Sequence, residues 1–258
     1  MIMFFAIFVS STLQICDIPV KGFKAQTIFN HDIVVYKSGD IVSSAIRKRR
    51  SWEMDVYQNL LPYMSKDTVF IDIGANIGWH SLFMASKQYT VVAFEPFIQN
   101  VKLFNASLCI NPDLRQRITL YNFGLSSKQL NCDLHQIPEI NYGDTHTACD
   151  EETKQNWIKH RYIKLGSMKT YRLDDVGRHL FPTKKVVKID VEGHEYDVLL
   201  GATLFFTTNN PPDALFVETF QLGKNKEAFF SLLKSWGYVV KFTDATNTLF
   251  IRHSENYA

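Results

Sequence analysis

The fold of this protein is decided by one stretch of sequence, VFIDIGANIG at residues 69–78. Val69 to Ile73 form a short apolar run and Ile77 to Ser86 have the composition of a helix, so a strand, a glycine turn and a helix are predicted. The glycines let the backbone approach a ligand closely, and the helix N-terminus offers free N–H donors. The spacing G-x-x-x-G differs from the G-x-G-x-x-G of dinucleotide-binding turns, and Asp72 would repel phosphate. The turn therefore suits either a ligand with a cationic amine or a purely structural role.

The alternation of strand and helix continues to the end of the chain. The predicted strands are 69–73, 90–94, 117–122, 186–189, 214–218, 238–242 and 248–251, and the predicted helices are 77–86, 98–108, 196–206 and 226–236. Such alternation implies βαβ units and an α/β fold with a doubly wound, mostly parallel sheet. A short turn joins the last two strands, which are expected to pair antiparallel at one edge. We also expect an amphipathic covering helix at 52–64 and a polar hairpin at 130–150.

Composition and charge exclude several classes of protein. With 46% hydrophobic and 21% charged residues, the 258 residues suffice for the core of one α/β domain and do not resemble a disordered chain. The 28 Lys and Arg residues against 26 Asp and Glu leave a net charge of +2, which supplies no broad basic field for nucleic acid. The basic cluster at 47–50 is interpreted as a solvated helix start. The aromatic content of 14% indicates a dense core or an apolar pocket.

The N-terminal segment favours entry into the secretory pathway. Residues 1–16 carry no charged side chain, and the apolar run at 2–9 is followed by small residues, as in a short signal peptide with a cleavage site. No Lys or Arg precedes the run, and a buried strand or helix, or a persistent anchor, are the alternatives. Because the run is shorter than the roughly 20 residues of a membrane span, no stable transmembrane span is expected. The predicted location is secretory or extracellular, with cytoplasmic as the alternative.

The cysteines leave three interpretations open. Cys132, His135, His146 and Cys149 form a C-x2-H-x10-H-x2-C pattern whose four side chains could hold tetrahedral zinc, although the spacing is not that of a standard zinc finger. Cys132 and Cys149 could instead face each other across a hairpin and form a disulfide in a secretory compartment. The third interpretation is two unbridged thiols and two unrelated histidines.

Acidic residues follow two predicted strands at positions that suit an adenosyl ligand. Glu95 ends the second strand about 20 positions after the glycine turn, where a carboxylate accepts hydrogen bonds from ribose hydroxyls. Asp72, beside the turn, suits a positively charged amino group. Together they favour S-adenosylmethionine, an adenosyl ligand that carries a cationic amino acid in place of phosphates. Asn122, after the third strand, is a candidate for an adenine contact.

Another group of candidate residues crowds the end of the predicted strand at 186–189: Asp190, Glu192, His194 and Glu195. Burying so many ionisable groups for packing alone would be costly, so a functional site is favoured. A carboxylate or imidazole there could position or deprotonate a nucleophile. Asp190 and Glu192 can converge only if a turn begins at Val191. A metal site that also uses Glu218 is the alternative, although no metal is expected.

The order and spacing of these segments resemble the FkbM-type methyltransferases, a family of class I S-adenosylmethionine-dependent enzymes. The resemblance rests on VFIDIGANIGWHSLFMA at 69–85, VVAFEP at 91–96 and VVKIDVEGHEYDVLLGA at 186–202, with weaker agreement at 169–175 and 247–251. It implies a seven-stranded sheet and, in many members, O-methylation of a small molecule or sugar. His194 stands where the family commonly has a small residue, and the first 60 residues lie outside the shared core.

The resulting hypothesis is methyl transfer from S-adenosylmethionine to a hydroxyl of a small-molecule or glycan acceptor. The expected catalytic residues are Asp190, Glu192 and His194, and the expected cofactor-binding residues are Asp72, Gly74, Ala75, Asn76, Gly78, Glu95 and Asn122. The expected divisions of the chain are an apolar segment at 1–20, an extension with the covering helix at 21–66 and the methyltransferase domain at 67–258. The alternatives are a protein or RNA methyltransferase and a catalytically inactive cofactor-binding domain.

Overall fold

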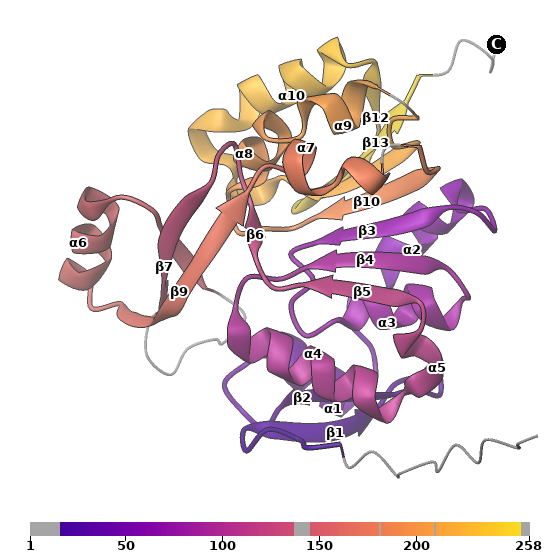
Figure 1. Cartoon of the computed structure of the whole chain (residues 1–258), viewed down its shortest axis with the longest axis vertical. Helices are drawn as coiled ribbons and strands as arrows, with labels where there is room; N and C mark the ends of the chain where they lie inside the picture. Colours follow the sequence, from indigo (N-terminus) through magenta and orange to yellow (C-terminus); the bar gives the residue numbers. More distant parts are fainter. Residues whose placement is uncertain (1–15, 137–144, 181, 209, 254–258) are drawn as a thin grey trace, which may run out of the picture.

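A seven-stranded sheet forms the centre of the computed structural model, which describes residues 16–136, 145–180, 182–208 and 210–253 (Figure 1). Its strands lie in the order β12-β13-β11-β10-β3-β4-β5, with the bounds β3 Val69–Ile73, β4 Thr90–Phe94, β5 Ile118–Tyr121, β10 Lys185–Ile189, β11 Ala214–Glu218, β12 Tyr238–Thr243 and β13 Asn247–Arg252. Neighbours from β5 to β11 are parallel, whereas β13 is antiparallel to β11 and β12. The predicted fold class is confirmed. The antiparallel strand β13 lies one place inside the sheet, and β12 forms the edge.

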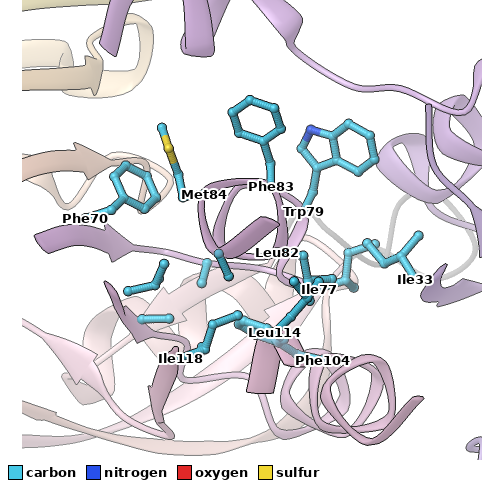
Figure 2. Packing of buried hydrophobic residues seen from close by; sticks show 14 of the residues in the cluster. Ile33, Phe70, Ile77, Trp79, Leu82, Phe83, Met84, Phe104, Leu114 and Ile118 are labelled. Atoms are coloured by element: carbon cyan, nitrogen blue, oxygen red, sulfur yellow. The ribbon is translucent and has the colours of Figure 1, made fainter. Parts of the chain in front are cut away.

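Side chains of the central strands alternate between two hydrophobic clusters, one on each face of the sheet. In β3, Phe70 belongs to the first cluster, whereas Ile71 and Ile73 belong to the second. The first cluster includes residues of α2 Met54–Leu60, α3 Trp79–Ser86, α4 Ile98–Ile110 and α5 Pro112–Arg115, and the second includes residues of α7 Leu173–Val176, α8 Glu195–Leu200, α9 Thr203–Thr207 and α10 Lys226–Ser235. Burial on both faces explains why these strands are nearly continuous apolar runs. Figure 2 shows part of the first cluster, around α3.

The N-terminal part of the chain packs into the first cluster as well. β1 Gly22–Gln26 and β2 Asp32–Tyr36 form an antiparallel hairpin, which lies beside α4 and is followed by α1 Ile41–Arg49 (Figure 1). Ile33, Val34 and Val35 of β2 are fully buried in the same cluster as Phe70 and Phe104. The segment predicted as an extension therefore shares its core with the main sheet.

Two helices differ from their predicted bounds. The basic cluster at 47–50 lies at the C-terminal end of α1, where positive side chains compensate the helix dipole, and not at a helix start. The predicted helix at 52–64 is the shorter α2, followed by a 3₁₀ turn at Leu61–Tyr63 that contains a proline at its start. Proline lacks an N–H donor, so the α-helical hydrogen bonding does not continue through it.

The predicted helix at 196–206 is divided into α8 and α9. Asp174 of α7 accepts hydrogen bonds from the N–H groups of Leu204 and Phe205 at 3.1 and 2.9 Å, and so begins the second helix. This contact also gives Asp174, which lies within the weaker family resemblance at 169–175, a structural role. Further 3₁₀ turns are at Arg178–Leu180 and Phe220–Asn225.

A second sheet of four strands stands beside the carboxyl ends of the main sheet. Its order is β6-β9-β7-β8, with the bounds β6 Gly124–Leu125, β7 Leu130–Gln136, β8 His146–Ala148 and β9 Ile163–Tyr171, and α6 Glu151–Lys159 follows β8 (Figure 1). β7 and β8 pair antiparallel, as the predicted hairpin at 130–150 requires, although 137–144 lie outside the described residues. β9 was not predicted, because it is rich in exposed and polar residues and contains Gly166.

Two disulfides resolve the interpretations of the cysteines. Cys132 and Cys149 are bridged across the β7–β8 hairpin, and Cys16 and Cys109 form a second bridge. Because both thiols of the pattern are bridged, the zinc interpretation fails.

Disulfides persist in oxidising compartments, which agrees with the predicted secretory location. The segment at 1–15, on which the signal-peptide prediction rests, lies outside the described residues. Within the described ranges, no helix combines the length and apolar character needed to cross a membrane.

Removal of the Cys132–Cys149 bridge should loosen the second sheet. The bridge closes a loop with a sequence separation of 17, and a crosslink of this length stabilises by about 2–4 kcal/mol. We expect the Cys132→Ser/Cys149→Ser variant to lose this much stability in denaturant unfolding and to exchange β7 and β9 amide hydrogens faster. The Cys16→Ser/Cys109→Ser variant is the matched control and should leave β7 protected. Unchanged exchange of β7 in the first variant would contradict the prediction.

Candidate active site

A cavity lies where the carboxyl ends of β3, β4 and β10 face the second sheet. It encloses about 820 Å³ of empty space, including the part that opens to solvent. The main-sheet side contributes all the charged groups of the lining, Glu95, Asp190 and Glu192, with Gly74, Asn76, Asn100 and His194, and also the apolar residues Ile73, Phe94, Pro96, Phe97 and Val191. The second sheet contributes Leu125, Leu134, Thr147, Cys149, Met168 and Thr170. Ligands of doubly wound sheets bind at this edge. The structure therefore brings most of the predicted site residues together.

The glycine turn after β3 is shaped by close packing. Gly74 has a φ of +81°, and a Cβ atom there would lie 1.8 Å from the backbone carbonyl oxygen of Asp190. Gly78 has a φ of +87°, and its Cβ would lie 2.4 Å from the Phe104 ring. Only glycine accepts both constraints at little cost. The turn therefore lies directly against the loop after β10, while Ala75 and Gly78 are buried and do not line the cavity.

Glu95 is buried at the centre of the main-sheet side of the cavity. Its Oε2 accepts a hydrogen bond from the Asn76 N–H at 2.8 Å, and its Oε1 accepts from the Phe97 N–H at 2.8 Å and the Asn100 amide at 3.3 Å. A carboxylate offers about four acceptor positions, so one position remains on Oε2. Burial raises the pKa of Glu95 to about 7, against the lowering effect of its hydrogen-bond donors.

Asp72 does not reach the cavity. Its side chain is fully buried beneath the turn, where Oδ2 accepts a hydrogen bond from the Ser81 hydroxyl at 2.6 Å and Oδ1 lies 3.9 Å from Nζ of Lys188. A direct contact of Asp72 with a cofactor amine, as predicted, would require this buried arrangement to change.

Lys188 is a buried cation that the prediction of an apolar strand at 186–189 overlooked. Its Nζ lies 3.0 Å from Oδ2 of Asp190 and 3.4 Å from the Gly74 carbonyl oxygen, in addition to the contact with Asp72. Burial alone would lower the pKa of Lys188, but the nearby carboxylates, Asp190 foremost, raise it above its usual range. A lysine within an otherwise apolar strand is the signal from which a buried ion pair could have been predicted, since charges are rarely buried unpaired.

The loop after β10 brings two of the predicted catalytic carboxylates to the cavity. β10 ends at Ile189, and Asp190 and Glu192 both line the cavity because the chain turns at Val191. Glu192 has a φ of +55°, and its Oε2 accepts a hydrogen bond from the Gln221 amide. His194 also lines the cavity and is partly exposed, with Nδ1 3.7 Å from Oδ2 of Asp197.

The remaining acidic residues of this region have different positions. Glu195 is buried and accepts hydrogen bonds from the N–H groups of Val191 and Gly193 at 3.0 and 3.2 Å, so it stabilises the loop itself. Burial raises the pKa of Glu218 to about 8, and the charges of Asp190 and Glu192 add to the effect. Among the described residues, no three His, Cys, Asp or Glu side chains are grouped closely enough to hold a metal ion.

Asn122 lies outside the cavity. Its amide donates hydrogen bonds to the backbone carbonyl oxygens of Glu95 and Pro96, both at 3.0 Å, and it borders a separate, more open hollow. Asn122 therefore supports the chain on which Glu95 is placed, and the predicted adenine contact would have to be made from that hollow.

Comparison with known proteins agrees with this architecture, which is that of the class I methyltransferases. The crystal structure of methyltransferase FkbM from Methylobacillus flagellatus has the same fold, with a TM-score of 0.50 and 17% identity, over 73% of this chain and 44% of that chain. Residues 72–240 match the family model described as the methyltransferase FkbM domain, and the chain belongs to this family.

Curated relatives resemble the same part of the chain. The hexuronic acid methyltransferase AglP of Haloferax volcanii is 33% identical over 165 residues, which cover 58% of this chain and 56% of the relative. Methyltransferase 1 of Beauveria bassiana is 29% identical over 154 residues, which cover 52% of this chain and 58% of the relative. The chain thus spans less than two thirds of the length of these relatives.

Replacement of Lys188 by methionine should leave two carboxylates near the cavity without their cation. We expect Lys188→Met to lower the free energy of unfolding by about 3–5 kcal/mol at neutral pH, because breaking a buried ion pair leaves uncompensated charge. The deficit should shrink at acidic pH, where protonated carboxyl groups no longer need a counterion. Denaturant unfolding at several pH values measures both effects.

Lys185→Met is the matched control for this prediction. Lys185 is also buried in β10, but its Nζ donates to the Asn210 carbonyl oxygen and lies over the Phe205 ring. Its replacement should give a smaller loss with less dependence on pH. A Lys188→Met deficit that is the same at every pH would contradict the role of Lys188 as a counterion.

Proposed function

We propose that this protein is an S-adenosylmethionine-dependent methyltransferase that methylates a hydroxyl group of a sugar or another small molecule. The observation that carries this proposal is the buried Glu95 carboxylate at the cavity, held by three donors and with one acceptor position left. Membership of the FkbM methyltransferase family supports the reaction class. The sugar is supported by the relative named as a hexuronic acid methyltransferase.

The groups that line the cavity suit the proposed cofactor in polarity. The buried Oδ1 of Asn76 has no hydrogen-bond partner in the described part of the chain, and it lies next to the Glu95 contact. Glu95 and Asn76 would hold the ribose, and the Gly74 turn would lie along the methionine portion. Carboxylates around the loop after β10 favour a ligand that carries positive charge. When bound, S-adenosylmethionine supplies a methyl group attached to a positively charged sulfur.

The acceptor hydroxyl would be oriented by the loop after β10. Asp190 is held by Lys188 and lines the cavity, with its side chain 32% exposed, so it can accept a hydrogen bond from an acceptor hydroxyl. In the proposed transfer, Asp190 would orient the hydroxyl oxygen toward the methyl group of the bound cofactor, and it would accept the hydroxyl proton or pass it to solvent. Glu192 and His194 are further candidates to contact the acceptor. Alignment in a site that excludes water supplies much of the rate enhancement.

The second sheet would provide the surface against which the acceptor lies. Its contribution to the cavity combines apolar side chains such as Leu134 and Met168 with the Thr147 hydroxyl. The Thr170 hydroxyl is already bonded to the Leu130 N–H and the Lys128 carbonyl oxygen. Apolar surface with a placed hydroxyl suits a small polar molecule such as a sugar. Together with the net charge of +2, this favours a small or glycan acceptor over a nucleic acid.

Cofactor affinity should depend on the ionisation of Glu95. Because the pKa of Glu95 is about 7 and the carboxylate is the better acceptor of ribose hydrogen bonds, affinity should rise as the pH increases through 7. Glu95→Gln should bind S-adenosylmethionine about ten- to a hundredfold more weakly at pH 8 and lose this pH dependence, as expected for removal of a charged hydrogen bond. Calorimetric titration from pH 5.5 to 8.5 measures both effects. Glu227→Gln, an exposed position in α10, is the control, and equal affinities of wild type and Glu95→Gln would refute the assignment.

Methyl transfer itself is tested with a labelled methyl donor and a panel of glycans, small alcohols, peptides and RNA. We expect transfer to a sugar or small-molecule hydroxyl, and a loss of at least about a hundredfold in Asp190→Asn, because an orienting group aimed at the reacting atom is removed. Cofactor affinity of this variant should change only a few-fold. Transfer to peptide or RNA would replace the proposed acceptor, and cofactor binding without transfer to any acceptor would indicate an inactive cofactor-binding domain.

A further inference from the structure

A chain of buried hydrogen bonds connects the N-terminal hairpin to the cavity. The hydroxyl of Tyr36, at the end of β2, donates to Oδ1 of Asn100 at 2.7 Å. The Nδ2 of the same amide donates to Oε1 of Glu95 at 3.3 Å. Tyr36 is 2% exposed and Asn100 is 4% exposed, so water does not easily replace either contact.

The direction of these bonds determines how Asn100 meets Glu95. A side-chain amide has one oxygen that accepts and one nitrogen that donates. The Tyr36 hydroxyl donates to the amide oxygen, and the nitrogen faces Glu95. A tyrosine hydroxyl can donate or accept, so it is the carboxylate, an acceptor only, that selects the nitrogen. Tyr36 holds the amide oxygen in place, and without its hydroxyl the Asn100 side chain would be less firmly fixed for donation to Glu95.

The hairpin that carries Tyr36 is fixed to α4, the helix that carries Asn100. The Val34 N–H donates to the Ser107 hydroxyl at 2.8 Å, and the Asn111 amide donates to the Asp32 carbonyl oxygen at 2.7 Å. The hairpin and α4 lie side by side in Figure 1. The Tyr36 hydroxyl is therefore presented to Asn100 from a firmly held strand.

We propose that Tyr36 is a positioning residue of the cofactor site, which acts through Asn100 on Glu95 and makes the N-terminal hairpin part of the methyltransferase active site. This inference rests on the proposed function only for the identity of the ligand that Glu95 binds. It extends the site to a segment that lies before the residues matched by the family model, 72–240.

Loss of the Tyr36 hydroxyl should shift the pKa of Glu95 in one direction. Donation from Asn100 lowers the pKa of Glu95, whereas burial, the largest influence, and the charge of Asp72 in β3 raise it. Asp190, Glu192 and His194 line the same cavity from the loop after β10. Loss of the Tyr36 hydroxyl should therefore raise the pKa of Glu95 above about 7, so that less of the carboxylate is ionised at neutral pH.

The test combines two measurements on the full chain of Tyr36→Phe, which removes only the hydroxyl. Carbon-13 NMR of labelled glutamate carboxyl groups follows the titration of Glu95 without any ligand, and calorimetry gives the affinity for S-adenosylmethionine between pH 5.5 and 8.5. We expect the midpoints of both curves to move to higher pH. We also expect affinity at pH 7 to fall about three- to tenfold, in the range of one neutral hydrogen bond.

Two further variants separate positioning from a general loss of structure. Tyr238→Phe removes another buried tyrosine hydroxyl, which donates to the Pro212 carbonyl oxygen at 2.9 Å far from the cavity, and it should leave both curves unchanged. Asn100→Leu should raise the Glu95 midpoint directly. If Tyr36 acts through Asn100, adding Tyr36→Phe to Asn100→Leu should cause no further shift, because the two effects are not additive.

The outcomes distinguish this inference from the proposed function. A Glu95 midpoint that is the same in wild type and Tyr36→Phe overturns the positioning role, whether or not the cofactor binds. A shifted midpoint in a protein that does not bind S-adenosylmethionine supports the connection from Tyr36 to Glu95 and overturns the proposed cofactor. A further shift in the double variant shows that Tyr36 acts by another route and also overturns the inference.

Discussion

The ion pairs of Lys188 are the interaction on which the rest of the site depends. The ammonium lies in β10 between Asp72 of β3 and Asp190 at the end of its own strand, and it also contacts the Gly74 carbonyl oxygen. Adjacent parallel strands bring these carboxylates to one edge of the sheet, where they would otherwise repel each other in a poorly solvated region. The cation compensates both charges and fixes the glycine turn relative to the loop after β10, so the residues proposed to bind cofactor and acceptor hold a common geometry.

Even with Lys188 in place, acidic groups outnumber cations around the cavity. Burial raises the pKa of Glu95 to about 7 and that of Glu218 to about 8, and neighbouring carboxylates contribute to both shifts. Raised pKa values of this kind mean that the site favours positive charge, since a bound cation would relieve the repulsion. S-adenosylmethionine carries positive charge on its sulfur and its amino group, whereas a dinucleotide would add negative charge. The electrostatics and the absence of a G-x-G-x-x-G turn therefore support the same class of ligand.

The sequence predicted the elements whose signals are local. The main sheet was predicted from short apolar strands and the glycine turn. Glu95 and Asp190 were predicted at the ends of two of these strands, and the structure places both at the cavity. Asp72 was assigned to the ligand because its position beside the turn does not reveal that its side chain is turned inward to Lys188. The role of Tyr36 depends on contact with Asn100, 64 positions away, and β9 has the polar composition of a loop. Long-range packing decides these features, and local patterns do not encode it.

The two sheets divide the work of the cavity. The main sheet provides the charged groups proposed to bind the cofactor, together with apolar side chains such as Phe94 and Phe97, whereas the second sheet provides mostly apolar side chains that suit an acceptor. The Cys132–Cys149 bridge closes the hairpin that forms part of the second wall, and Cys149 itself lines the cavity. The residues proposed to bind the cofactor lie on the main-sheet side of the cavity. Substitutions in the second sheet, at positions such as Leu134 or Met168, can therefore change which acceptor binds without disturbing Glu95. We infer that acceptor specificity belongs to the second sheet, whose shape depends on an oxidising environment.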